Sequence, residues 1–187
     1  MPLLRSDVGL ASRPLSGPFW RVLQFASAAM PRSCHESDYR LREAVQNDLQ
    51  WRLLERLSPF DRAHHLCVRD RLLNDGHDDP DLLLAAALHD VGKADGHGRV
   101  CLGHRVLKVV LEHLSPVVLE RVSRWDNAVG HGLYLATNHA ALGALLVQAA
   151  CGSERCQELI ANHHHDPATV SDAELRLLIA ADEGALA

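Results

Sequence analysis

The sequence predicts an all-α protein built as a single-domain helical bundle. Apolar residues recur at the three- and four-residue steps of an amphipathic helix over most of the 187 residues. No run of β-branched residues alternates with polar ones in the way that is typical of a strand. Capping residues and short connections between the apolar segments favour packing between neighbouring helices. A chain of this length can bury a substantial core.

Composition along the chain indicates three regions. Residues 1–17 contain Ser, Pro and Gly, and we expect a flexible N-terminal tail there. Residues 18–58 are expected to form an N-terminal helical extension, and residues 59–187 the main helical domain. Within the extension, the pattern predicts a short helix from Phe19 to Met30 and a longer one from Tyr39 to Leu57.

Helix starts in the main domain follow from capping residues. Ser58 and Pro59 open a helix that reaches Asn74, and Asp79 with Pro80 opens the next one. Further helices are expected over residues 80–92, 103–114, 116–125, 138–150, 154–164 and 171–183.

Two of these helix starts depend on particular caps. Asn138 is expected to cap the helix that follows it, which leaves residues 130–136 irregular. Ser171 and Glu174 have the spacing of a capping box and are expected to open the last helix.

The bulk composition argues against several classes of partner. The formal net charge is −5 and aromatic residues make up 4% of the chain, so we expect binding neither to a nucleic acid polymer nor to a membrane. No apolar run has the length of a membrane span, and residues 1–17 lack the apolar core of a signal peptide. The five cysteines form no CxxC pair and no even framework, which favours a reduced, cytoplasmic protein.

The strongest functional signal is the segment Leu82–Lys93. Its helix is apolar on every side and should therefore be buried. His89 and Asp90 at its end would be costly to bury without a charged partner. A divalent metal ion would supply that charge, because imidazole nitrogen and carboxylate oxygen both ligate first-row metals. The competing interpretation is a histidine at the helix end beside an exposed aspartate.

His64 is a second candidate ligand. It lies four residues from Phe60 and from Val68, so it faces the core of its helix. The neighbouring His65 has charged residues at the same spacing, and we expect it at the surface. A lone histidine such as His64 could also be a core residue bonded to a backbone carbonyl.

Asp182 is a third candidate ligand. It follows Leu178 by four residues, so it lies on the apolar stripe of the last helix. A carboxylate near a helix C-terminus is opposed by the helix dipole and is stabilised by a cation. The alternative is a frayed terminus.

The later histidines are candidates for a second group of ligands. His139 precedes an apolar helical stretch, although it could also be an exposed histidine of a first turn. Of the three successive histidines at 163–165, His164 follows Ile160 by four residues and is our choice, with His163 next. All three could instead be imidazolium groups at a negative helix end.

The ordered series His64, His89-Asp90, Asp182 resembles the HD domain superfamily of metal-dependent phosphohydrolases. The resemblance covers about residues 59–183, and its clearest part is the segment that ends in His89-Asp90-Val91-Gly92-Lys93. Four further segments resemble family elements: Ala63–Val68, Asn138–Ala144, Ile160–Asp166 and Ile179–Asp182.

The resemblance implies a helical bundle with metal ligands on different helices. His64, His89, Asp90 and Asp182 would hold one ion. In the bimetallic branches of the family the later histidines hold a second ion, and this role would fall to His139 and His164, with His163 or His165 as a neighbour.

The expected cofactor is one or two divalent transition metal ions. Mixed nitrogen and oxygen ligands suit Mn, Fe, Co, Ni or Zn without distinguishing among them. Asp90 and Lys93 are the candidate catalytic residues, Asp90 to orient the attacking water and Lys93 to contact a phosphate oxygen. Lys93 could equally be a solvated loop residue.

Departures from the family narrow the substrate. No Gly-Tyr-Pro triplet follows the histidine cluster, and Lys93-Ala94 stands where the alarmone hydrolases carry an acidic pair. The chain is short for a deoxynucleoside-triphosphate triphosphohydrolase. These features favour a stand-alone HD phosphohydrolase that acts on a nucleotide or another small phosphorylated metabolite. A di-iron oxygenase and a non-catalytic, metal-stabilised binding or signalling module remain open, as does a homo-oligomer.

Overall fold

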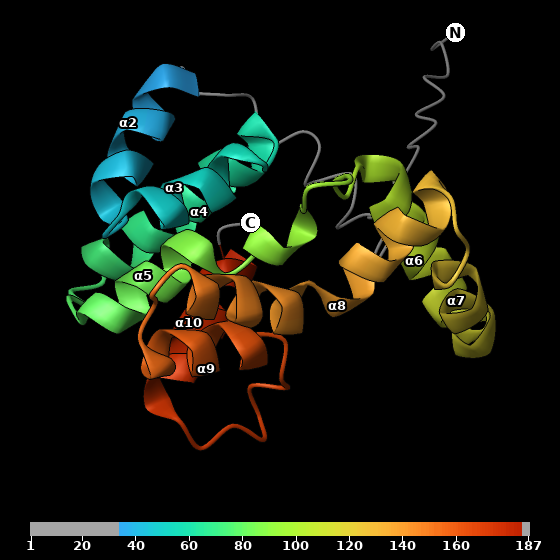
Figure 1. Ribbon diagram of the computed structural model, residues 1–187. Coiled ribbons are helices and arrows are strands. Elements are labelled where there is room, and N and C mark those ends of the chain that lie inside the picture. Colours follow the sequence, from blue (N-terminus) through green and yellow to red (C-terminus); the bar gives the residue numbers. More distant parts are fainter. Residues whose placement is uncertain (1–33, 185–187) are drawn as a thin grey trace, which may run out of the picture.

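Helices make up the regular structure of residues 34–184, the part of the chain that the computed structural model describes (Figure 1). The helices of this part are α2 (Cys34–Ala44), α3 (Asp48–Glu55), α4 (Pro59–Asn74), α5 (Pro80–Leu88), the 3-10 helix η1 (Val91–Lys93), α6 (Leu102–Leu114), α7 (Pro116–Ser123), α8 (Ala128–Ala149), α9 (Glu154–Asn162) and α10 (Ala173–Gly184). Within the same residues, β pairing is limited to one isolated bridge, between Ala94 and Arg99. The all-α prediction is confirmed. The tail expected over residues 1–17 and the helix expected from Phe19 to Met30 lie outside the described residues.

α5 is the centre of the bundle. Every residue from Leu82 to Leu88 is buried except Leu83, which is half-buried. The helices α2, α4, α9 and α10 all pack against α5. The expectation that this helix is buried on every side is therefore confirmed, and its C-terminal end lies inside the protein.

α8 connects the bundle to a smaller lobe, which is formed by α6, α7 and the first part of α8. Figure 1 shows it running from the lobe, where it lies beside α6 and α7, to the bundle, where it lies beside α9. Val100, Leu135 and Ala136 form a separate small core near the lobe. α8 therefore has one end in each part of the fold and passes the end of α5 on the way.

A close approach of η1 to α8 fixes where α8 passes. A Cβ atom at Gly92 would overlap the carbonyl oxygen of His139 and would lie only 2.6 Å from the backbone nitrogen of Gly143. Only glycine leaves room for the two backbones to touch here. This contact places Asp90, which immediately precedes η1, against the face of α8 that carries His139.

Several helix boundaries differ from the predicted ones. The expected helix from Tyr39 to Leu57 is broken, because the side chain of Asn47 accepts a hydrogen bond from the backbone N–H of Gln50 and so caps a new helix, α3. The helix predicted to end at Gly92 ends instead at Leu88 and is followed by η1.

The start of α8 was predicted eleven residues too late, since its cap is Asn127 and not Asn138. Residues 130–136 are helical because Gly130 and Gly132 have no side chain and so allow close packing that outweighs their low helix propensity. Asn138 lies inside the helix, where its side chain donates to the carbonyl of Tyr134.

The cap of the last helix was also misplaced by one residue. The side chain of Asp172, and not that of Ser171, accepts a hydrogen bond, from the backbone N–H of Leu175 at 3.2 Å. The predicted caps at Ser58 and Asp79 are confirmed, because both side chains accept hydrogen bonds from the first turns of α4 and α5.

We predict that Gly92→Ala destabilises the protein. The added methyl group must push η1 away from α8, and overpacking of this kind costs about 1–3 kcal/mol of unfolding free energy. Urea denaturation measures the change. Gly96→Ala is the matched control, because nothing lies within 4 Å of a Cβ at Gly96. Equal stability of the two variants would contradict the close contact.

Candidate metal centre

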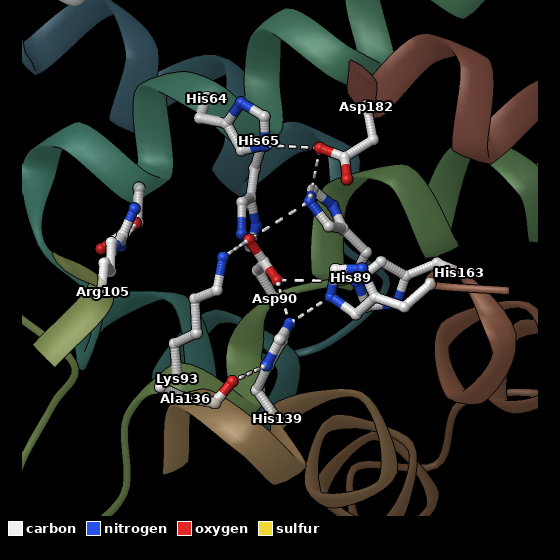
Figure 2. A network of polar contacts seen from close by, with 12 residues as sticks. His64, His65, His89, Asp90, Lys93, Arg105, Ala136, His139, His163 and Asp182 are labelled. Carbon is white, nitrogen blue, oxygen red and sulfur yellow. Dashed lines mark hydrogen bonds and ion pairs between the residues drawn. The ribbon is translucent and has the colours of Figure 1, made fainter. Parts of the chain in front are cut away.

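The carboxylate of Asp90 lies at the centre of a cluster of histidines at the end of α5 (Figure 2). Its side chain is 3% exposed. One oxygen, Oδ2, forms an ion pair with Lys93 Nζ and lies 3.5 Å from His89 Nε2. The other, Oδ1, lies 3.2 Å from His139 Nε2 and 3.7 Å from His163 Nε2. A single carboxylate therefore faces two sets of imidazoles.

The first set joins α4, the end of α5 and α10. Donor atoms of His64, His89 and Asp90 lie within 4.8 Å of one another. Asp182 of α10 completes the set, with its Oδ1 at 2.9 Å from His64 Nε2 and 3.5 Å from His89 Nε2. Figure 2 shows His64 and Asp182 on the opposite side of Asp90 from His139. Two imidazoles and two carboxylates therefore converge from three helices.

The second set joins Asp90 to α8 and to the end of α9. Donor atoms of Asp90, His139, His163 and His164 also lie within 4.8 Å of one another. The Nε2 atoms of His139 and His164 are only 2.6 Å apart. Asp90 belongs to both sets, so the two candidate sites are adjacent.

Three of the histidines are oriented by the same kind of hydrogen bond to the backbone of their own helix. In each one, Nδ1–H donates to the backbone carbonyl three residues earlier in the chain. The bonds are His89 to Ala86 at 2.9 Å, His139 to Ala136 at 3.0 Å and His163 to Ile160 at 2.7 Å. Because a carbonyl only accepts, the proton is on Nδ1 and Nε2 points toward Asp90. Ligating histidines in metal sites are held in this way.

The cluster contains buried polar atoms without a hydrogen-bond partner among the described residues. These atoms are His89 Nε2, Asp90 Oδ1 and His163 Nε2. An imidazole whose only proton is on Nδ1 presents a lone pair at Nε2, and Asp90 Oδ1 presents another. His89, whose pKa is raised, can instead carry a second proton at Nε2. Lone pairs that face one another in a buried site are costly unless a cation lies between them. The donor set therefore fits a divalent metal ion.

The carboxylates are ionised and require positive charge. Burial would raise the pKa of Asp90, but Lys93 and His89 hold it well below its usual range. Burial likewise opposes ionisation of Asp182, yet His89 and His64 lower its pKa. Burial lowers the pKa of His89, but Asp90 and Asp182 together raise it to about 10. A proton on His89 and a metal ion are thus alternative ways to neutralise the same two carboxylates.

Two histidines of the second set, His139 and His164, are held neutral, as metal ligands must be. Burial lowers the pKa of His139. Burial, and then the neighbouring His163 and His139, lower the pKa of His164 to about 3. Neutral rings keep a nitrogen lone pair for a metal ion near neutral pH.

The structure brings together all six of the sequence-predicted ligands. They are His64, His89, Asp90, His139, His164 and Asp182. His163, the second choice at its position, belongs to the cluster as well, whereas His165 is exposed. The feature that distinguishes His163 from the two histidines after it is its position at the end of α9. From there its Nδ1–H donates to the carbonyl of Ile160.

The expectation that His65 lies at the surface was wrong. His65 is fully buried, its Nδ1–H donates to the carbonyl of Ala87 at 2.7 Å, and its ring lies 4.6 Å from that of His89. The charged neighbour Asp61 did not mark a solvent-facing side, because Asp61 is itself buried in an ion pair with Arg105. Burial and His89 lower the pKa of His65 to about 3.

A pocket of about 790 Å³ opens beside the second set. Lys93, His139 and His164 reach its wall from the cluster. Its other walls come from the start of α4, the segment before α6, α6 itself and α8. A ligand in this pocket would touch the metal centre at one end and the lobe at the other.

Comparisons of the chain with protein-family models, with curated proteins and with solved structures gave no match. Among the described residues, no helix has both the length and the apolar character that crossing a bilayer requires.

We predict that metal content follows the two sets of donors. His163→Ala should remove one ion and Asp182→Asn should weaken binding of the other, while Asp90→Asn should impair both, because Asp90 alone belongs to both sets. Metal analysis after loading and dialysis measures the number of ions per chain. His165→Ala is the matched control, since it removes an exposed histidine next to the cluster. Full metal content in Asp90→Asn would contradict the shared carboxylate.

We also predict that metal binding releases a proton and strengthens as the pH rises. A raised pKa of about 10 means that His89 is protonated at neutral pH, and an ion at its Nε2 must displace that proton. Affinity should therefore increase with pH from about 6 to 9. Calorimetry in buffers of different ionisation enthalpy counts the protons, with about one per ion expected in the first set. Binding without proton release would show that His89 is not a ligand.

Proposed function

We propose that the protein is a metal-dependent phosphohydrolase of the HD type that cleaves a small phosphate ester. The observation that carries this proposal is the pair of donor sets that share Asp90 and open, through His139 and His164, onto a pocket lined by Lys93. This arrangement combines what ester hydrolysis requires: sites for metal ions, a positive charge for the phosphate and room for a substrate.

The residues present suit mixed nitrogen and oxygen coordination. His64, His89, Asp90 and Asp182 would hold one ion, and Asp90 with His139, His163 and His164 a second. Such ligands favour Mn, Fe, Co, Ni or Zn. When bound, the ions lower the pKa of a water molecule and draw negative charge from the phosphate.

Asp90 and Lys93 are the catalytic residues of the proposal. Lys93 Nζ pairs with Asp90 and also lines the pocket, so its ammonium group can contact a phosphate oxygen as a point charge. Asp90, as an ionised acceptor, can orient the attacking water. In the reaction the water oxygen bonds to phosphorus, the bond from phosphorus to the ester oxygen breaks, and the alcohol leaves with a proton.

A second candidate function is a di-iron oxygenase. The observation that favours it is the shared Asp90, because two adjacent metal sites are what the two-iron branch of HD-like proteins requires. Loading with iron under anaerobic conditions, followed by measurement of oxygen uptake, separates the two activities. A non-catalytic metal-stabilised module would show neither activity while still retaining metal.

We also propose that the protein is a cytoplasmic enzyme that acts on a small molecule. Four cysteines whose side chains the structure describes, Cys67, Cys101, Cys151 and Cys156, are free thiols, which is compatible with a reducing compartment.

We predict that the metal-loaded protein releases phosphate from phosphate esters and that Lys93→Gln lowers kcat/KM about a hundred-fold without loss of metal. The variant removes the charge that faces the phosphate but no metal ligand. The measurement is phosphate release from monoesters, diesters and nucleotides with each of the five metals. Arg124→Gln is the control, because Arg124 is an exposed residue of the lobe, paired with Glu120. No hydrolysis by a folded protein with any metal would overturn the proposal.

A further inference from the structure

The pocket beside the metal centre is far larger than a phosphate group needs. At about 790 Å³ it has the volume of a site for a complete small molecule. Away from the cluster its wall is mainly apolar and is made by Phe60, Val100, Leu102, Val109 and Ala136. The part of a substrate that lies beyond the phosphate therefore meets mostly hydrocarbon.

The pocket wall is poorly equipped to recognise a nucleobase. No Asn, Gln or Glu side chain of the described residues lines it. Its one carboxylate that belongs to neither metal set, Asp61, is engaged by Arg105 and accepts a hydrogen bond from Ser58 at 2.6 Å. Base edges are often distinguished by side-chain amides, which both donate and accept, and by ionised carboxylates, which accept.

Arg105 is held in place on the wall of the pocket. Asp61, whose side chain is 5% exposed, forms an ion pair with Nη2 of Arg105, and the guanidinium lies 5.8 Å from the ring centre of Phe60. Burial would raise the pKa of Asp61, but Arg105 lowers it, so the pair is charged. Within the described residues only Nη2 is engaged by a side chain, and a guanidinium has five N–H donors. The remaining donors are available to an anion.

Arg105 and Lys93 mark two separate cationic positions in one pocket. Lys93 touches Asp90 at the metal centre, whereas Arg105 lies on α6, and Figure 2 shows it on the far side of Lys93 from His163. Arg99 adds further positive charge to the wall, whereas Lys108 of the same wall is paired with Glu112 at 2.6 Å. Asp61 pairs with Arg105 and Glu112 with Lys108, so Arg99 leaves this part of the wall with a net positive charge.

We propose that the pocket takes a phosphate ester with a mainly apolar body and a second anionic group, which Arg105 binds. This inference rests on the proposed function, because it requires the phosphate of the ligand to lie at the metal centre. The apolar wall selects the body, and the preorganised guanidinium selects the far end of the substrate.

Binding of non-hydrolysable phosphonates to the metal-loaded protein tests this proposal by calorimetry. Alkylphosphonates are compared with ω-carboxyalkylphosphonates over a series of chain lengths. At the best length the carboxylate should strengthen binding about ten-fold, as expected for one charge-assisted hydrogen-bonded pair. Adenosine monophosphate should bind more weakly than that compound. Equal affinity with and without the carboxylate, or tighter binding of the nucleotide, would overturn the inference.

Variants assign the effect to Arg105. Arg105→Gln should abolish the gain from the carboxylate and leave binding of the plain alkylphosphonate unchanged. Since this variant leaves Asp61 buried without a partner, the double variant Asp61→Asn with Arg105→Gln removes both charges and should behave in the same way. Arg121→Gln, at an exposed site on α7, is the control and should keep the full gain. A gain that survives in the double variant would show that Arg105 does not bind the second anion.

The outcomes separate this inference from the proposed function. If phosphonates bind but their affinity depends neither on the carboxylate nor on Arg105, the inference fails and the phosphohydrolase proposal stands. If no phosphonate binds to protein that retains its metal, the phosphate does not lie at the metal centre, and both fail.

Discussion

The burial of one ionised carboxylate, that of Asp90, is the constraint on which the rest of the structure depends. Its Oδ2 faces Lys93 and His89, and its Oδ1 faces His139 and His163. An unpaired carboxylate in this position would be prohibitively costly, so positive charge must lie beside it. The end of α5 supplies His89 and η1 supplies Lys93, whereas α8 and α9 bring imidazole nitrogens that leave Oδ1 facing a place for a cation. The bundle is organised around the charge of a single side chain.

Features that depend on local chemistry could be predicted from the sequence. The caps at Ser58 and Asp79 follow from short-range hydrogen bonding, and the buried α5 follows from an unbroken run of apolar residues. His64 and Asp182 could be found because each is a polar residue on an apolar helical face, where burial demands a partner. Each of these features depends on residues that are close together in the chain, within one or two helical turns.

Features that depend on contacts between distant segments could not be predicted. α8 begins at Asn127 because Gly130 and Gly132 pack closely against other parts of the lobe, and helix propensity alone disfavours them. His65 was misplaced because the ion pair that buries Asp61 comes from Arg105, 44 residues away in the chain. The same pair forms part of the wall of the pocket, so this wall could not be predicted from residue spacing.

The bonds from Nδ1 of the histidines to carbonyls of their own helices have a consequence for metal selectivity. His89, His139 and His163 are oriented by backbone three residues away, so their rotamer entropy is lost when the chain folds and not when an ion binds. A site of this kind is rigid before the ion arrives, so it discriminates between ions by how well their preferred geometry fits the fixed imidazoles. The choice among the first-row metals would then depend on this fit as well as on the relative availability of the ions.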